Sequence, residues 1–286
     1  MLRAWPLPDQ PQGGGKEQRG RVLVVGGQRD LAGAVRLAGE AALRAGAGKL
    51  QLAVAAGAAP ALAIAVPEAR VLGLSEAADG GLASGGRWLA TVAARADALV
   101  LGPGTEKSVA LHALAGRLLP RLAGTVVLDA GALDLPLLRA WHRLRGRPAA
   151  IVTPHHGEMA ALLGCDEASV AAHAPRLAAA FARAWNLVVV LKSADTWIAD
   201  ASGGVWLHRN GPPGLGTSGS GDVLAGLIGG LCARGAAPAQ AACWGVWLHA
   251  RAAAKLPGRG GPGFLAREIA AGVPALLARA QAAGVS

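Results

Sequence analysis

The sequence contains no tyrosine and only 2 phenylalanines and 3 cysteines among its 286 residues. Cys165, Cys232 and Cys243 lie far apart and show none of the short spacings of metal-binding cysteines. This usage excludes a small fold held together by disulfides. We interpret the three cysteines as small core residues of a protein in a reducing compartment, so the predicted location is the cytoplasm.

The chain also lacks an uninterrupted hydrophobic run of the length that crosses a membrane. The longest candidate, residues 50–66, is broken by Gln51, Gly57 and Pro60, and it predicts a buried strand followed by a short helix. The first 8 residues are interrupted by an arginine and two prolines and lack the apolar segment of a signal peptide. We therefore expect no association with a membrane.

Charged side chains are scarce, at 16% of the residues, whereas hydrophobic residues make up 52%. This balance supplies a large core and argues against disorder. The 28 Lys and Arg residues exceed the 18 Asp and Glu residues, and the formal charge of +10 suits anionic ligands such as nucleotides. Because the arginines are scattered instead of forming a basic face laced with aromatic residues, we expect no nucleic-acid partner.

Short apolar segments alternate with helical patterns along most of the chain. Residues 1–19, rich in Pro, Gln, Gly and charge, predict a mobile N-terminal arm, and residues 20–286 predict a single domain. Strands are expected at 21–27, 49–54, 97–102, 125–129, 149–153 and 187–192, and a β-hairpin at 197–208, with helices filling the rest. This order predicts an α/β fold with a central, mostly parallel sheet flanked by helices on both faces.

Glycines and polar residues follow the ends of several of these strands. They are Gly26, Gly27, residues 102–104, Asp129, residues 155–158 and Lys192. In an open parallel sheet, the carboxyl ends of the strands form the crevice in which ligands bind. The coincidence therefore predicts an enzyme or a nucleotide-binding protein.

The most informative stretch is the loop at residues 211–222. Glycines and small hydroxyl residues crowd ahead of Asp222, and an apolar helical pattern starts directly after it. The first turn of a helix has unpaired N–H groups and a partial positive charge, so the backbone of Gly219, Ser220 and Gly221 is expected to form an anion hole for a phosphate. Asp222 is then the candidate general base of a phosphoryl transfer. The alternative is an ordinary glycine-rich loop with a capping aspartate.

Three other polar residues each have a functional and a structural interpretation. Lys192, with Thr196 nearby, either contacts phosphate oxygens or extends to solvent. His155, preferred over His156 because it is nearer the strand end, either contacts substrate or starts a helix. Asp129 either holds Mg²⁺ through water or a sugar hydroxyl, or caps a loop. The His-His-x-Glu run has no usual zinc spacing, so we expect no protein-held metal.

Together these motifs resemble those of the ADP-dependent NAD(P)H-hydrate dehydratases, which belong to the ribokinase-like superfamily. The resemblance covers residues 20 to about 280 and rests on segments 24–27, 32–35, 41–48, 101–104, 128–133, 153–158, 190–192 and 214–222. The glycine-rich loop before Asp222 is shared by the whole superfamily. Its combination with Gly-Pro-Gly at 102–104 and Thr-Pro-His-His-Gly-Glu at 153–158 is more specific.

The resemblance implies a repair reaction in which hydrated NADH or NADPH is dehydrated, while ADP with its Mg²⁺ counter-ion is converted to AMP and phosphate. It implies that Asp222 is the catalytic base, and that Ala34, Gly104, His155 and Asp222 contact the hydrated dinucleotide. The implied nucleotide contacts are Lys192, Ser193, Ala194, Asp195, Thr196 and Gly221. Family resemblance also suggests a homotetramer, although the tryptophan-bearing stretch 243–249 fits either an interface or the core.

Four positions depart from the family pattern. Gly131 replaces an aspartate, His156 a proline, Ser193 a glycine and Pro212 an asparagine. The changes at Gly131 and Pro212 keep open a catalytically silent nucleotide-binding protein. A second alternative is an ATP-dependent kinase of a thiazole- or pyrimidine-type alcohol, which would have the same fold and use the same Asp222. Some family members carry a fused epimerase domain, for which this chain is too short, so we expect a separate epimerase as partner.

Overall fold

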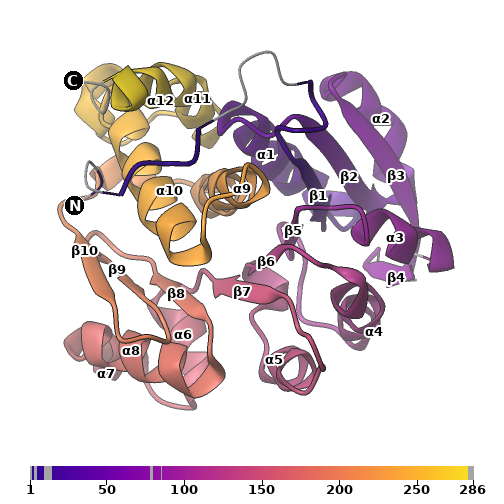
Figure 1. Ribbon diagram of the computed structural model, residues 1–286, viewed down its shortest axis with the longest axis horizontal. Coiled ribbons are helices and arrows are strands. Elements are labelled where there is room, and N and C mark those ends of the chain that lie inside the picture. Colours follow the sequence, from indigo (N-terminus) through magenta and orange to yellow (C-terminus); the bar gives the residue numbers. More distant parts are fainter. Residues whose placement is uncertain (1, 3–4, 10–14, 78–79, 85, 283–286) are drawn as a thin grey trace.

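Ten strands form one sheet in the order β10-β9-β8-β7-β6-β5-β1-β2-β3-β4 in the computed structural model, which describes residues 2, 5–9, 15–77, 80–84 and 86–282 (Figure 1). The strands are β1 Arg21–Val25, β2 Lys49–Ala55, β3 Ala69–Glu76, β4 Leu82–Ser84, β5 Ala98–Leu101, β6 Thr125–Leu128, β7 Ala149–Val152, β8 Val188–Leu191, β9 Thr196–Ala199 and β10 Val205–His208. In this sheet order, all neighbouring strands between β8 and β3 pair in parallel. Strands β4, β9 and β10 are antiparallel to their neighbours. The predicted mostly parallel sheet and the hairpin are confirmed.

Helices cover both faces of the sheet, as predicted. One face carries α1 Ala32–Arg44, α2 Ala59–Ala65, α9 Ser220–Ala233, α10 Pro238–Ala253, α11 Ala266–Ala271 and α12 Val273–Ala282. The other carries α3 Gly86–Ala93, α4 Val109–Leu118, α5 Leu135–His142, α6 His156–Leu163, α7 Glu167–Ala172 and α8 Ala174–Trp185. Short 3₁₀ turns are η2 Arg29–Leu31, η3 Ala56–Ala58, η4 Leu119–Arg121, η5 Ala130–Ala132, η6 Pro213–Gly216 and η7 Pro257–Gly260.

The two hydrophobic cores follow from the alternation of side chains along each strand. In β1, Val22 and Val24 belong to the core under α1 and α9, and Leu23 and Val25 to the core under α4 and α5. Both sets are fully buried. Strands buried on two faces need unbroken apolar runs, which is why these segments were readable in the sequence.

Helices α1 and α9 pack with their backbones in direct contact. A Cβ added to Gly226 would lie 2.0 Å from the carbonyl oxygen of Ala38, and one added to Gly230 would lie 2.4 Å from that of Ala42. These glycines therefore let α9 lie close against α1. The contact fixes the position of the first turn of α9, which follows the glycine-rich loop.

We predict that Gly226→Ala lowers the free energy of unfolding by roughly 1–3 kcal/mol, because the added methyl group forces the two helices apart. Gly116→Ala is the matched control. Gly116 lies in α4, where an added Cβ meets no atom within 4 Å, so alanine should stabilise that helix slightly. Urea titration of both variants measures the difference. Equal stability of the two variants would contradict the tight contact.

Some features differ from expectation. Strands β3 and β4 were not predicted, because exposed Arg70 and Gly73 interrupt the apolar pattern of β3 and β4 has only 3 residues. Cys165 is exposed, so its interpretation as a core residue was wrong, whereas Cys232 and Cys243 are buried; all three are free. The boundary of the mobile arm stays a prediction. Within it, Leu7 is buried, and the carbonyl oxygens of Trp5 and Pro6 accept hydrogen bonds from Trp244 and Gln240 of α10.

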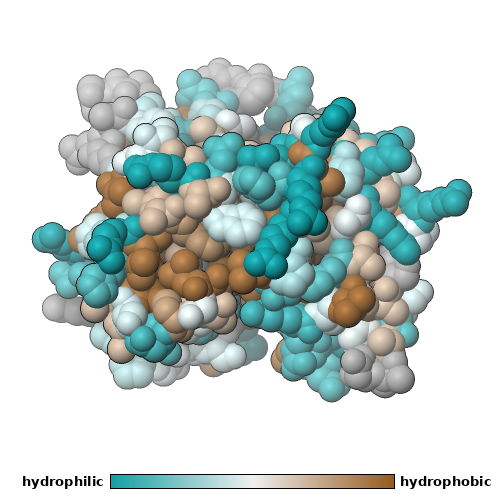
Figure 2. Space-filling model, turned by 90° about the horizontal axis from the view of Figure 1, so that it is seen from below, coloured by the Kyte–Doolittle hydropathy of each residue, from teal (hydrophilic) through white to brown (hydrophobic). Residues whose placement is uncertain are grey.

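Across the part of the chain that the structure describes, no helix combines the length and hydrophobicity needed to cross a bilayer. Figure 2 shows one face of the molecule, on which hydrophilic side chains are spread around the outline and an apolar area lies left of the centre. This spread agrees with the scattered charges of the sequence.

Candidate active site

The glycine-rich loop leads into α9 through a left-handed residue. Gly219 has φ +86° and is the N-cap of α9, so the helix begins at Ser220 and Asp222 lies in its first turn. The N–H of Ser220 donates to the carbonyl of Thr217 at 3.3 Å. In the described structure, the N–H groups of Gly219 and Gly221 have no protein acceptor, so these two amides can receive an anion at the positive end of the helix.

Asp222 is half-buried beside these amides. Its Oδ2 lies 3.9 Å from the position that a Cβ on Gly219 would take. No hydrogen bond or ion pair holds its carboxylate among the residues that the structure describes. Burial, with a further contribution from Asp129, raises the pKa of Asp222 to about 7, although Lys192 opposes the shift. A carboxylate with that pKa is suited to act as a base near neutral pH.

Lys192 does not extend to solvent. Its Nζ lies 3.1 Å from Asp129 Oδ1 and 3.7 Å from Glu158 Oε2. Asp129 is only 3% exposed and also accepts a hydrogen bond from Thr153 Oγ1 at 2.6 Å. Burial lowers the pKa of Lys192, but the two carboxylates outweigh it and raise this pKa. Lys192 is therefore a fixed cation, and Oδ1 of Asp129 is occupied by protein donors.

His155 caps helix α6. Its Nδ1 accepts hydrogen bonds from the N–H groups of Gly157 at 3.0 Å and Glu158 at 3.4 Å, so the ring proton is on Nε2. Glu158 accepts the N–H of His155 at 2.8 Å and lies 3.6 Å from its Nε2. The His155 side chain is 56% exposed, which leaves the Nε2 edge accessible to a ligand.

The turn at residues 193–196 is closed by its own hydrogen bonds. Thr196 Oγ1 donates to the carbonyl of Ser193 at 2.8 Å, and Ser193 Oγ donates to that of Asp195 at 2.6 Å. The N–H of Gly211 donates to the carbonyl of Ala194 at 2.8 Å, which joins this turn to the start of the glycine-rich loop. A Cβ on Gly221 would lie 3.3 Å from Lys192 Nζ, so the turn, Lys192 and the first turn of α9 are neighbours.

Ala34 and Gly104 lie together on the other side of the loop. A Cβ on Gly104 would be 2.8 Å from Cβ of Ala34 and 2.3 Å from the carbonyl of Leu31. One on Gly219 would be 2.5 Å from Cδ1 of Leu37, which follows Ala34 by one turn of α1. Helix α1 therefore connects the Ala34–Gly104 contact with the first turn of α9. The predicted residues thus form two neighbouring groups that meet at 219–222.

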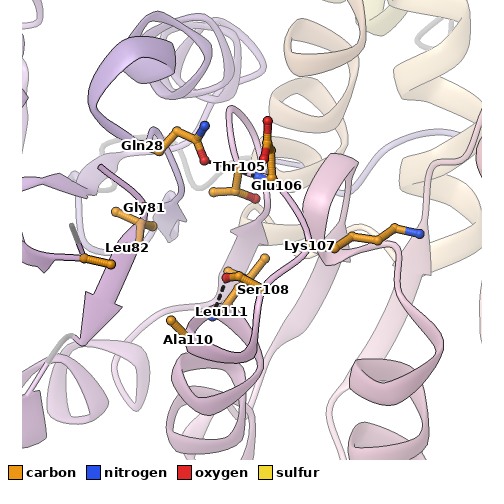
Figure 3. A pocket seen from close by; sticks show the side chains of 10 residues that line it. Gln28, Gly81, Leu82, Thr105, Glu106, Lys107, Ser108, Ala110 and Leu111 are labelled. Atoms are coloured by element: carbon orange, nitrogen blue, oxygen red, sulfur yellow. Dashed lines mark hydrogen bonds between the residues drawn. The ribbon is translucent and has the colours of Figure 1, made fainter. Parts of the chain in front are cut away.

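A cavity of about 230 Å³ opens beside Gly104 (Figure 3). It is lined by Gln28, Ala77, Gly81, Leu82, Thr105, Glu106, Lys107, Ser108, Ala110 and Leu111. The side chain of Lys107 extends away from it, and its Nζ lies 3.8 Å from Asp134 Oδ1 (Figure 3). Asp222 is not among the lining residues. The volume is below the range of about 300–1,000 Å³ typical of ligand pockets, so it suits part of a ligand.

The structure gives a local reason for three departures from the family pattern. A Cβ on Gly131 would lie 2.5 Å from Thr105 Oγ1, so glycine allows the 105–106 segment to lie closer than an aspartate would. His156 is the first residue of α6, where proline is favoured but not required. Ser193 has no positive φ, so glycine is not needed there. Nothing in the structure explains Pro212.

The comparisons with known proteins point to one family. A family model described as NAD(P)H-hydrate dehydratase matches residues 22–275. The chain belongs to the NAD(P)H-hydrate dehydratase family. The expected family is thereby confirmed, and the alternative of a small-molecule kinase is not favoured. A crystal structure of a ribokinase-like superfamily protein from Enterococcus faecalis superposes with a TM-score of 0.82 at 24% identity, over 98% of this chain and 94% of that one, which confirms the expected fold.

Individual relatives agree with this family. The chain is 54% identical to the ADP-dependent (S)-NAD(P)H-hydrate dehydratase of Xanthomonas campestris pv. campestris, over 97% of this chain and 94% of that protein. A crystal structure of the ADP/ATP-dependent NAD(P)H-hydrate dehydratase from Bacillus subtilis, co-crystallized with ATP/Mg²⁺, superposes with a TM-score of 0.81 at 29% identity, over 98% of this chain and 96% of that one.

Other members of the NAD(P)H-hydrate dehydratase family are longer. The bifunctional NAD(P)H-hydrate repair enzyme Nnr of Moorella thermoacetica is 40% identical over 88% of this chain but only 48% of its own length. The chain thus spans about half of that relative.

The contacts of Glu158 and Thr153 with other residues of the site were not predicted from the sequence. Glu158 completes the capping box of α6 and also contacts Lys192, which no pattern in the sequence predicted. Thr153 lies in the same motif, and its hydroxyl donates a hydrogen bond to Asp129 that the sequence did not predict. The available signal was the polar Thr-Pro-His-His-Gly-Glu segment after a buried strand.

Proposed function

We propose that this chain catalyses the ADP-dependent dehydration of hydrated NADH or NADPH, with release of AMP and phosphate. The observation that carries the proposal is Asp222, a half-buried carboxylate with a pKa of about 7 that stands directly after two amides open to an anion. A base and an anion site on the same helical turn suit the transfer of a phosphoryl group to a hydroxyl.

The reaction proceeds through phosphorylation of the ring hydroxyl. Asp222 accepts the proton of this hydroxyl as its oxygen bonds to the terminal phosphorus of ADP and the bond to AMP breaks. The lone pair of the ring nitrogen then expels phosphate, and the neighbouring ring carbon loses a proton to restore the double bond. The amides of Gly219 and Gly221 stabilise the charge on the transferring oxygens. Phosphorylation is needed because hydroxide is a poor leaving group.

The two neighbouring groups of residues divide the ligands in part, because His155 lies beside Lys192 and would meet the hydrate from the nucleotide side. We assign Lys192, the turn Ser193–Thr196 and Gly221 to ADP, and Ala34, Gly104 and His155 to the hydrate. The cavity beside Gly104 lies on the hydrate side and suits the part of the dinucleotide beyond the reacting ring.

Mg²⁺ fits as the counter-ion of ADP. In the described part of the chain no cluster of three His, Cys, Asp or Glu side chains is placed to hold a metal. Mg²⁺ usually binds through substrate phosphates with few protein ligands, which agrees with that arrangement. When bound, it neutralises charge on the phosphates.

The cellular setting belongs to the same proposal. Three free cysteines fit a cytoplasmic location. We further propose a homotetramer that works with a separate epimerase, which would interconvert the two forms of the hydrate.

The test is a spectrophotometric assay with purified protein and hydrated NADPH. Return of the reduced-nicotinamide absorbance with ADP and Mg²⁺, together with AMP and phosphate in equal amounts, supports the proposal. Omission of ADP is the control. Phosphorylation of a thiazole alcohol by ATP, without hydrate turnover, would instead identify a kinase, and tight ADP binding without any turnover would identify a silent binding protein.

We predict that kcat/KM rises about tenfold per pH unit below neutrality and levels off above about pH 7. The reason is that Asp222 must be ionised to act as the base, and its pKa is raised to about 7. The measurement is kcat/KM for the hydrate between about pH 5 and 9. A profile that is flat through neutrality, with its inflection near the ordinary value of an aspartate, would contradict this assignment.

A further inference from the structure

A buried histidine lies directly beneath the first turn of α9. His249 of α10 has its Nε2 3.1 Å from Ser220 Oγ. His249 is 6% exposed and Ser220 is 4% exposed, so water does not compete for this hydrogen bond. The pair joins two helices at the residue that lies between Gly219 and Gly221.

The imidazole of His249 is neutral at physiological pH. Burial lowers the pKa of His249 to about 4; a hydrogen bond with the backbone of Ser220 opposes this shift, whereas nearby Lys192 and His208 add to it. A neutral imidazole has one donor and one acceptor nitrogen. A serine hydroxyl can donate to a bare Nε2 or accept from a protonated one, so the hydrogen bond forms with either tautomer of His249.

A serine bonded to a histidine is also the arrangement of a nucleophile and its base, but that role does not fit here. Ser220 Oγ is buried beneath the anion site and does not face a substrate. A histidine with a pKa of about 4 is also a weak base at neutral pH. Ser220 and His249 therefore hold the first turn of α9 in place, and Ser220 does not act as a nucleophile.

The segment 219–221 needs such an anchor. Glycine has the greatest backbone freedom of all residues, so a Gly-Ser-Gly segment loses much entropy when it is fixed. Ser220 has the one side chain of the three, and its hydroxyl is held by His249. Helix α10, which carries His249, is itself fixed against α9. Its Gly245 packs so closely on α9 that an added Cβ would lie 2.6 Å from Ile228 Cγ1.

We propose that His249 is a positioning residue, which fixes Ser220 and thereby holds the Gly219 and Gly221 amides and the Asp222 carboxylate in the alignment that phosphoryl transfer requires. His249 touches neither ligand and acts through Ser220 alone. This inference rests on the proposed function, because the alignment matters for a phosphoryl group that moves between ADP and a hydroxyl.

The test compares Ser220→Ala, which removes the hydroxyl, with His249→Leu, which removes its hydrogen-bond partner, and His249→Gln, whose side-chain amide can donate or accept in place of Nε2. We expect kcat to fall about ten- to a hundredfold in the first two variants, because a small misplacement of catalytic groups has an effect of that size. ADP affinity should fall as well, while KM for the hydrate stays within about twofold. His249→Gln should recover most of kcat.

Melting temperatures and a double variant separate positioning from a merely structural role. Ser220→Ala/His249→Leu should be no slower than the slower single variant, because the two changes break the same hydrogen bond. Ser202→Ala, in the exposed turn between β9 and β10, is the control and should behave as wild type. A folded Ser220→Ala protein with wild-type kcat and ADP affinity would overturn the inference, even if His249→Leu fails to fold.

The experiment also separates failure of this inference from failure of the proposed function. Wild-type protein that binds ADP but does not dehydrate the hydrate would contradict the function. In that case the ADP affinities of the same variants, measured by calorimetry, decide the inference alone. An unchanged affinity in Ser220→Ala would then reject it.

Discussion

Replacing Asp222 with asparagine should reduce turnover by at least about a hundredfold while leaving the fold and ADP affinity nearly unchanged. Asparagine has the shape of aspartate but cannot accept the hydroxyl proton. The two open amides of the first turn of α9 remain in place, so the phosphate site persists. Steady-state kinetics with hydrated NADPH and calorimetry with ADP give the two measurements.

Asp166→Asn is the matched control for that variant. Asp166 caps α7 through the N–H of Ser169 at 2.7 Å, and asparagine caps a helix about as well, so full activity is expected. A near-normal rate in Asp222→Asn would remove Asp222 from its role as base.

The same substitution should also change how stability depends on pH. Because the folded pKa of Asp222 is raised to about 7 from 3.8, its ionisation opposes folding increasingly as pH rises between these values, and by a constant amount above them. Asparagine is never ionised. The gain in free energy of unfolding from Asp222→Asn should therefore be larger at pH 8 than at pH 5, as measured by urea titration.

Lys192→Ala should weaken ADP binding and also lower the free energy of unfolding by about 3–5 kcal/mol. The loss of stability is expected because Asp129 would be left buried without its cation, and an unpaired buried charge has a cost of that order. Since Lys192 opposes the raised pKa of Asp222, its removal should also move the inflection of the pH–rate profile upward.

Lys255→Ala, at an exposed position after α10, is the control and should change neither the ADP affinity nor the free energy of unfolding. Calorimetry with ADP and urea titration of both variants measure the two effects. Unchanged nucleotide affinity in Lys192→Ala would count against the phosphate contact, and unchanged stability would count against the ion pair with Asp129.

The sequence predicted the inner strands well because they are buried on both faces and therefore uniformly apolar. Val188–Leu191 and Ala98–Leu101 are examples. Strand β3 escaped because it is near the edge of the sheet, where exposed Arg70 and Gly73 interrupt the pattern. The anion-binding role of the loop before Asp222 could be predicted, because few other roles explain a cluster of glycines directly ahead of an apolar helix.

The environment of each site residue could not be predicted in the same way. Lys192, Asp129 and Glu158 come from three different segments, and their meeting depends on the order of β6, β7 and β8 in the sheet. Similarly, Ser220 and His249 are separated by 29 residues, and stretch 243–249 gave no sign of which helix would lie against it. Contacts between distant segments leave no local pattern.

The close approach of Gly226 and Gly230 to α1 has a consequence for motion. Ala34, which we assign to the hydrate, and the phosphate-binding turn belong to two helices whose main chains are in contact at Gly226 and Gly230. Helices α1 and α9 would have to separate before one could slide past the other. Any tightening around bound ligands must therefore come from loops outside this pair, while the spacing between the two binding halves stays set before either ligand arrives.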